Sequence, residues 1–235
     1  EKLAPEKPLA KPTKKHKALV CSLMTGFKHW STPHTAEVIK VLGKKTGAYE
    51  VFESNDVKYF EPENILELGT HLGMGTLAIK LGIPEAEITS VEGCQNTFEF
   101  TKNNIERWLS KTMPADKPLK SGQIKLVNSS FAEYFEKRSK DRDAQQKISS
   151  QKFDLIYLDG HHNGPATLDY FEQIKRQVHK DSLVIIDDIH WSQSMTAAWN
   201  KIIKDPQVTV SIDTYFWGLI FFRKEQAKEH FVVRT

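Results

Sequence analysis

The chain has 235 residues, of which 39% are hydrophobic and 27% charged, a composition typical of one soluble globular domain with a sizeable core. Its formal net charge is only +3, too small to indicate a nucleic-acid or membrane partner by itself. No apolar run approaches the roughly 20 residues that a bilayer-spanning helix needs. The two cysteines, Cys21 and Cys94, lack metal-binding spacing, so we expect reduced thiols and a cytoplasmic location.

The first 60 residues differ in composition from the rest of the chain. Residues 1–25 are rich in lysine and proline, and we interpret them as a solvated N-terminal extension rather than an anion-binding arm. Residues 26–60 are predicted to form a helical or lid segment, because apolar residues recur at helical spacing over 35–45. The main domain is predicted over residues 61–235.

From residue 61 onward, predicted strands alternate with predicted helices. The strands are expected at 64–68, 88–92, 124–127, 153–158, 182–186, 208–212 and 215–222. The helices are expected at 75–81, 96–109, 131–138, 165–178 and 195–203, with polar loops at 110–123 and 137–151. Little more than a turn separates the last two strands, so they must be antiparallel. We therefore predict an α/β fold, a Rossmann-like doubly wound sheet of seven strands, mostly parallel with a C-terminal antiparallel hairpin.

The turn after the first of these strands carries the most specific motif. It reads Glu67-Leu68-Gly69-Thr70-His71-Leu72-Gly73-Met74-Gly75. Glycine permits backbone conformations that a Cβ would block, and Gly75 lets the following helix pack close to the strand. In open α/β sheets, ligands bind at the carboxyl ends of strands where the strand order reverses. The motif therefore predicts a ligand pocket at this turn.

Glu92, at the end of the next strand, supplies the second half of the predicted pocket. A carboxylate about 20 residues after the first glycine can accept hydrogen bonds from both hydroxyls of a ribose. The alternative is that Glu92 is a solvated strand end. The spacing Gly-x-x-x-Gly-x-Gly differs from the Gly-x-Gly-x-x-Gly of dinucleotide-binding proteins. Because Glu67 would repel a phosphate, the pattern favours a phosphate-free, cationic ligand such as S-adenosylmethionine.

Three carboxylates stand at the ends of the fourth and fifth strands: Asp159, Asp187 and Asp188. Neighbouring parallel strands end side by side, and like charges this close repel unless a proton or a cation intervenes. Carboxylate oxygens suit Mg²⁺, so we predict a divalent metal at Asp159, Asp187 and Asp188. The alternative is that each aspartate accepts hydrogen bonds from a following turn.

Three histidines, His161, His162 and His190, follow these aspartates directly. A histidine beside a cleft can act as a general base near neutral pH. We expect the three to converge on the carboxylates and to include the base. The alternative is that each is an ordinary polar residue of a loop.

These motifs together resemble those of a known family. The glycine-rich turn is similar to motif I of class I S-adenosylmethionine-dependent methyltransferases, and Glu92 to their ribose-binding acid. Leu158-Asp159-Gly160-His161-His162 resembles the Asp-Gly-x-His signature of the small-molecule O-methyltransferase branch. Asp187-Asp188 stands where catechol-type and caffeoyl-CoA-type enzymes carry an Asp-Asn metal pair. The likeness covers the chain from about Gly26, and its C-terminal stretch resembles an uncharacterised group of Bacteroidetes methyltransferases.

The resemblance implies the roles of individual residues. Catalysis is expected from Asp159 and from His162, which stands at the position of the catechol-type catalytic lysine. Mg²⁺ or another divalent cation is expected at the three aspartates, although Asp188 replaces the usual asparagine. Gly164 stands where the family often has an aromatic residue. The predicted contacts to S-adenosylmethionine are Glu67, Gly69, Thr70, Gly73, Gly75, Glu92, Ser130 and Asp159.

The predicted function is metal-assisted O-methylation of a small-molecule hydroxyl, with no membrane or nucleic-acid partner. Two alternatives stay open. One is a protein that binds S-adenosylmethionine without catalysis, and the other is a methylase of RNA or protein that uses the lysine-rich start. A homodimer stays open as the assembly.

Overall fold

The computed structural model describes residues 16–20, 37, 40–41, 44–45, 49–53, 62–112, 123–144, 152–225 and 227–233. The chain forms two compact units, Glu1–Glu61 and Pro62–Thr235. The first contains two parallel strands, β1 (His16–Val20) and β2 (Tyr49–Glu53). Neither strand was expected, and β1 ends the lysine-rich stretch in an apolar run. The helix expected at 35–45 lies largely outside the described residues, and those described there are helical.

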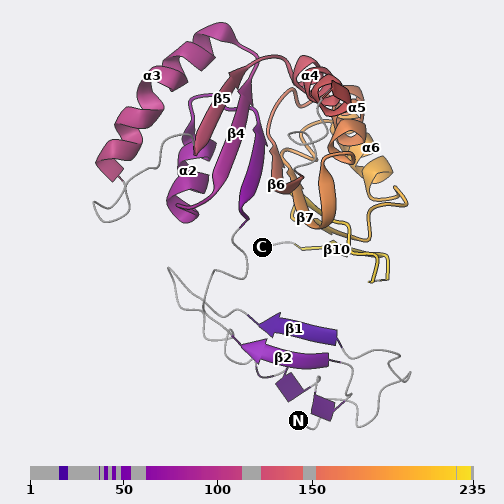
Figure 1. The fold of residues 1–235 in the computed structure, drawn as a ribbon. Coiled ribbons are helices and arrows are strands. Elements are labelled where there is room, and N and C mark those ends of the chain that lie inside the picture. Colours follow the sequence, from indigo (N-terminus) through magenta and orange to yellow (C-terminus); the bar gives the residue numbers. More distant parts are fainter. Residues whose placement is uncertain are drawn as a thin grey trace. The chain divides into compact units, whose positions relative to one another are not determined.

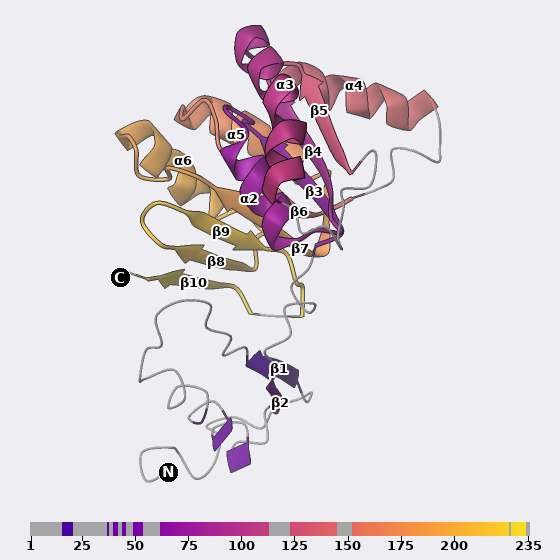
Figure 2. The ribbon, with the colours of Figure 1, turned by 90° about the vertical axis from the view of Figure 1, so that its left-hand side faces the viewer.

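The second unit is a sheet of eight strands with helices on both faces (Figures 1 and 2). The strands are β3 (Asn64–Leu68), β4 (Glu87–Glu92), β5 (Ile124–Asn128), β6 (Phe153–Leu158), β7 (Val178–Ile186), β8 (Val210–Asp213), β9 (Gly218–Phe221) and β10 (Glu229–Val232). Their spatial order is β10-β8-β9-β7-β6-β3-β4-β5. Within this sheet β9 runs antiparallel to β7 and β8, and the other pairs are parallel. The predicted fold class is confirmed, and β10 is an eighth strand added at the edge.

In the described part of this unit, five helices cover the two faces of the sheet. They are α2 (Met74–Gly82), α3 (Gln95–Thr112), α4 (Phe131–Ala144), α5 (Gly164–Ile174) and α6 (Gln193–Ile202). Helices α2 and α3 lie on one face, and α4, α5 and α6 lie on the other (Figure 1). Because both faces are covered, the central strands are mostly apolar: Ile65, Leu66 and Leu68 of β3 have no exposed surface.

The chain order reverses between β3 and β6, and this reversal places the candidate site. From β3 the chain steps outward through β4 to β5 and then crosses back to β6 on the other side of β3. The carboxyl ends of β3 and β6 therefore lie next to each other with their connections leading in opposite directions. A crevice at this edge is where open α/β sheets bind ligands.

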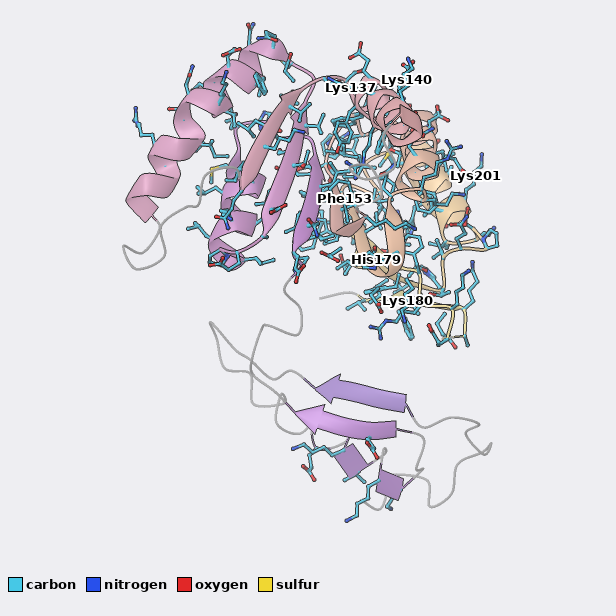
Figure 3. All side chains as sticks on the ribbon, viewed as in Figure 1. Lys137, Lys140, Phe153, His179, Lys180 and Lys201 are labelled. Atoms are coloured by element: carbon cyan, nitrogen blue, oxygen red, sulfur yellow. The ribbon has the colours of Figure 1, made fainter. Side chains whose placement is uncertain are left out.

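Three elements differ most from the prediction, and polar residues at their ends are the reason. Strand β7 begins at Val178 rather than at residue 182, and α5 ends at Ile174 rather than at residue 178. The start of β7 is irregularly paired, and the Ser182 hydroxyl fixes it by donating to the Phe153 carbonyl at 2.7 Å. Helix α4 continues to Ala144 through a stretch expected as a loop. The sequence of its second half is polar and has no apolar periodicity, so it gave no helical signal. Lys137 and Lys140 in this helix point away from the sheet (Figure 3).

Candidate functional site

The glycine-rich turn joins the ends of three strands. At Gly69 the backbone has a φ of 113°, and a Cβ there would overlap the carbonyl oxygen of Asp159. The Gly69 N–H donates to the Val91 carbonyl of β4 at 3.0 Å, and the Asp159 N–H donates to the Leu68 carbonyl at 2.9 Å. Only glycine permits this approach, so Gly69 fixes the carboxyl ends of β3, β4 and β6 against one another.

Glu67 lies beneath this turn rather than on its surface. The residue is 1% exposed, and its Oε2 accepts hydrogen bonds from the hydroxyls of Ser90, at 2.6 Å, and Thr76. The Thr70 hydroxyl lies 2.6 Å from that of Ser90 and joins the same buried network. Glu67 Oε1 is buried without a hydrogen-bond partner among the described residues, in space that the missing side chain of Gly75 leaves. Burial raises the pKa of Glu67 to about 7.

Glu92 links the turns that follow β3 and β4. Its Oε2 accepts from the His71 N–H and its Oε1 from the Cys94 N–H, both at 2.8 Å. Its backbone carbonyl accepts from the Ser129 N–H after β5 at 3.0 Å. Each carboxylate oxygen has two lone pairs, so both retain acceptor capacity for an incoming hydroxyl. Glu92 therefore shapes the rim and can still receive a ligand.

Two further predicted cofactor contacts, Gly73 and Ser130, cap helices. Gly73, with a φ of 82°, is the N-cap of α2 and leaves the first N–H groups of that helix without a side-chain cap. Ser130 forms a reciprocal capping box with Glu133 at the start of α4: each backbone N–H donates to the other's side chain at 3.2 Å. The structure thus gives Ser130 a local structural role at the rim.

The acidic residues predicted to bind a metal form a chain of contacts with two side chains between them. The Tyr157 hydroxyl donates to Asp187 Oδ2 at 2.9 Å and lies 3.3 Å from Asp159 Oδ2. The His162 ring follows, with Nε2 at 3.7 Å from Asp159 Oδ1 and Nδ1 at 3.5 Å from Asp188 Oδ2. The sequence therefore predicted the grouping of Asp159, Asp187 and Asp188 but missed Tyr157.

Burial and like charge act on two side chains of this acidic cluster, Asp159 and Tyr157. Burial raises the pKa of the Asp159 carboxyl, and the negative charge of Asp187 raises it further. Burial and the neighbouring carboxylates also raise the pKa of Tyr157, which stays a hydrogen-bond donor. Among the residues that the structure describes, no group of three acidic, histidine or cysteine side chains is arranged to hold a metal ion. As placed, Asp159 and Asp187 share the Tyr157 hydroxyl instead.

The three histidines do not converge as the sequence predicted. His162 contacts the aspartates, whereas His161 Nδ1 lies 2.8 Å from the Tyr170 hydroxyl on α5. His190 is tied elsewhere, with Nε2 2.8 Å from Asp213 Oδ2 and Nδ1 3.1 Å from the Thr196 hydroxyl. The expectation fails because a histidine that follows a strand is free to turn toward either flanking helix. Of the three, His162 remains the candidate base.

Backbone strain is concentrated at this same edge. Among the described residues, the non-glycine positions with a positive φ are His71, His161, His162, Asp188 and Tyr215. Each lies in a turn at the carboxyl end of β3, β6, β7 or β8. Such conformations cost about 1–3 kcal/mol each and persist where the surroundings enforce them, commonly at functional sites. The strain supports placing the site here, independently of the motifs.

Comparison with known proteins identifies the part of the chain that carries these features. A protein-family model described as a methyltransferase domain matches residues 66–189, which span the glycine-rich turn, Glu92 and all three aspartates. Among curated protein sequences, none matches the chain at a significant level. In the described part of the chain, no helix has the length and apolar character needed to cross a membrane.

Solved structures share the fold at low sequence identity. A provisionally assigned caffeoyl-CoA O-methyltransferase of Staphylococcus aureus is 15% identical, with a TM-score of 0.52 over 85% of this chain and 86% of that one. An O-methyltransferase of Bacillus cereus in complex with SAH is 17% identical, with a TM-score of 0.51 over 85% and 84%. An SAH-bound methyltransferase of Podospora anserina is 16% identical, with a TM-score of 0.50 over 72% and 75%.

Proposed function

The chain belongs to this methyltransferase-domain family, and we propose that it transfers a methyl group from S-adenosylmethionine to a hydroxyl oxygen of a small molecule. One observation carries the proposal: the reversal of strand order between β3 and β6 brings the glycine-rich turn and the acidic cluster to one edge of the sheet. A cofactor held at the first and an acceptor held at the second would lie side by side. The fold of the chain is similar to that of the O-methyltransferases of S. aureus and B. cereus, which supports the proposal.

The residues of the turn fit this cofactor, which supplies an electrophilic methyl group on a sulfonium and carries no phosphate. Glu92 retains lone pairs at the rim for the ribose hydroxyls. Glu67 has one buried oxygen without a partner among the described residues, which suits a cationic ammonium rather than a phosphate. Contacts from the remaining predicted positions stay predictions: Gly69, Thr70, Gly73, Gly75, Ser130 and Asp159.

His162 is the residue that we propose as the proton acceptor. As the new carbon–oxygen bond forms, the hydroxyl proton of the acceptor has to leave, and the carbon–sulfur bond breaks to release S-adenosylhomocysteine. His162 lies between Asp159 and Asp188, at 3.7 and 3.5 Å, so a proton taken by the imidazole is stabilised by two carboxylates. Holding both reactants in line supplies much of the remaining acceleration.

The proposal also includes assistance of the methyl transfer by a divalent metal ion. The carboxylates of Asp159, Asp187 and Asp188 are ligands of the type that Mg²⁺ prefers, and a bound cation would lower the pKa of the acceptor hydroxyl. The Tyr157 hydroxyl lies between Asp159 and Asp187, and among the described residues the carboxylates are not arranged as a metal site. A cytoplasmic location, a homodimer and kinship with the Bacteroidetes group stay predictions.

Substitution of Asp159 tests the proposal. Methyl transfer from labelled S-adenosylmethionine is measured over a panel of hydroxylated acceptors, with EDTA and then with added Mg²⁺. We expect Asp159→Asn to lower turnover by about a hundredfold or more, since it removes a carboxylate beside the base. Binding of S-adenosylhomocysteine should stay nearly unchanged, because asparagine keeps a side-chain oxygen for the predicted cofactor contact. Asp181→Asn, an exposed aspartate paired with Arg223, is the control. If Asp159→Asn turns over as fast as the wild type, the proposed role of Asp159 beside the base is contradicted. If EDTA does not change turnover, metal assistance is contradicted.

A further inference from the structure

Tyr157 lies inside the acidic cluster, and the proposed methyl transfer does not use it. It stands two residues before Asp159 on β6, so both side chains project from the same face of the sheet. Its ring is half-buried and packs against the start of α2, because a Cβ added to Gly75 would lie 3.9 Å from Tyr157 Cε1. The strand and the helix together direct the ring, and they bring its hydroxyl to the aspartates.

The Tyr157 hydroxyl contacts one of the two carboxylates that flank His162 directly. It lies 3.3 Å from Asp159 Oδ2, while Asp159 Oδ1 faces the imidazole with His162 Nε2 3.7 Å away. A carboxylate that is hydrogen-bonded through one oxygen loses freedom to rotate, so its other oxygen keeps its direction. The contact with Tyr157 therefore turns Asp159 toward the base.

The same hydroxyl reaches the other flanking carboxylate, that of Asp188, through Asp187. The Tyr157 hydroxyl donates to Asp187 Oδ2 at 2.9 Å, and Asp187 Oδ1 accepts from the Asp188 N–H at 2.9 Å. Asp188 has a φ of 53°, a conformation that persists only where the surroundings enforce it. Its Oδ2 lies 3.5 Å from His162 Nδ1. These contacts, with those of Asp159, form a closed cycle that begins and ends at one hydroxyl.

We propose that Tyr157 is a positioning residue for the methyl transfer: its hydroxyl fixes the two carboxylates that flank His162 and thereby sets the place of the imidazole. The proposal rests on the proposed function, because it takes His162 as the proton acceptor. A base is effective only within hydrogen-bond reach of the proton that it removes, and active sites commonly hold it there with a further group. Tyr157 acts through the carboxylates alone, so its loss should slow proton transfer and leave cofactor binding unchanged.

Tyr157→Phe tests the positioning directly, because it keeps the ring against α2 and removes only the hydroxyl. NMR spectra of protein with isotope-labelled histidine are recorded in EDTA with saturating S-adenosylhomocysteine, and the His162 imidazole signal is assigned from its absence in His162→Gln. We expect Tyr157→Phe to shift or broaden the His162 signal and to leave that of His190 in place. Tyr134→Phe, which removes a hydroxyl on α4, is the matched control and should move neither signal.

Two results of this measurement overturn the inference without an acceptor being known. One is a His162 signal in Tyr157→Phe that equals that of the wild type. The other is a difference that added Mg²⁺ abolishes, because the cation rather than Tyr157 would then order the aspartates.

Turnover of two acceptors separates positioning of the base from a purely structural role. Methyl transfer to catechol and to 4-nitrocatechol is measured at pH 8; the nitro group makes the hydroxyl more acidic, so the second acceptor depends less on a base. We expect Tyr157→Phe to lower kcat about tenfold for catechol and less than about threefold for 4-nitrocatechol, with the KM for S-adenosylmethionine unchanged. In His162→Gln, the added Tyr157→Phe substitution should cost nothing further.

Equal losses for the two acceptors, or a loss in the double variant that is the product of the two single losses, would assign Tyr157 a structural role and overturn the inference. The proposed function would stand in that case. If the wild type transfers a methyl group to no hydroxylated acceptor, the proposed function fails, and the inference fails with it.

Discussion

At Gly69 a single missing methyl group determines whether the three strand ends can meet. Gly69→Ala would place a Cβ against the Asp159 carbonyl at a φ of 113°, so we expect it to lower the free energy of unfolding by about 3 kcal/mol or more. Gly82→Ala, at the end of α2 with open space around it, is the matched control and should change stability by less than about 1 kcal/mol. Urea unfolding measures both. Equal stability of the two variants would contradict the close approach at Gly69.

Glu67 gives the stability of the protein a dependence on pH. Its pKa is raised from 4.5 to about 7 in the folded protein, so the folded state binds a proton more tightly than the unfolded state does. The stability from this group is fully present below pH 4.5 and is lost as the pH rises through about 7. One pKa unit corresponds to about 1.4 kcal/mol, so the loss is on the order of 3 kcal/mol.

Glu67→Gln removes this titration and keeps an acceptor for Ser90 and Thr76. We expect the difference in unfolding free energy between variant and wild type to shift in favour of the variant by roughly 2–3 kcal/mol from pH 5 to pH 8. Urea unfolding at several pH values measures this difference. Parallel stability curves for the two proteins would show that Glu67 does not titrate in this range.

The sequence predicted which residues lie together at the ends of neighbouring strands. It did not predict the hydrogen-bond partners of side chains in the turns. Asp159, Asp187 and Asp188 were grouped correctly because parallel strands end at one edge of a sheet. Tyr157 was within reach of the same reasoning, since it lies two residues before Asp159 and so on the same face of β6. Pairing of His190 with Asp213 could not be predicted, because it depends on how the β8–β9 turn folds back onto the loop after β7.

At the level of elements, Ser130 distinguishes a helix cap from a ligand contact. Its hydroxyl accepts from the Glu133 N–H at the start of α4, and loss of such a cap costs about 1 kcal/mol. We expect Ser130→Ala to lower the free energy of unfolding by that amount, and Ser130→Asp, which can still cap, to restore it. Thermal unfolding measures the stability, and calorimetry with S-adenosylhomocysteine measures the ligand contact. If Ser130→Ala weakens the binding of S-adenosylhomocysteine and leaves the stability unchanged, Ser130 is a ligand contact and not a helix cap.

The strands that the sequence predicted best are mostly apolar runs that end at a turn residue. Strands β3 and β6 were predicted with the bounds that the structure has, because each is an apolar run closed by a turn residue. Strand β7 was shortened, since His179-Lys180-Asp181 interrupts the apolar pattern and is held by local hydrogen bonds instead. Edge strand β10 was missed because its residues are exposed, and pairing with β8 alone leaves no periodic signal.

At the level of the whole molecule, the order of the strands brings together motifs that are far apart in the sequence. The alternation of strands and helices predicted a doubly wound sheet, and that prediction is confirmed. The position of the reversal, between β3 and β6, is a property of the complete chain, and it brings residues 67–75 next to residues 157–162 and 187–188. The parallel strands of the first unit lay outside any pattern that the sequence offered.

The account depends most on binding of S-adenosylmethionine at the ends of β3 and β4, and calorimetry tests this directly. S-adenosylhomocysteine is titrated into wild-type protein, into Glu92→Ala and into Glu87→Ala, a control at the exposed start of β4. We predict that the wild-type protein binds S-adenosylhomocysteine saturably at one site per chain. The affinity should fall about tenfold to a hundredfold in Glu92→Ala and should stay at the wild-type value in Glu87→Ala. If the wild-type protein binds neither S-adenosylmethionine nor S-adenosylhomocysteine, the account is contradicted.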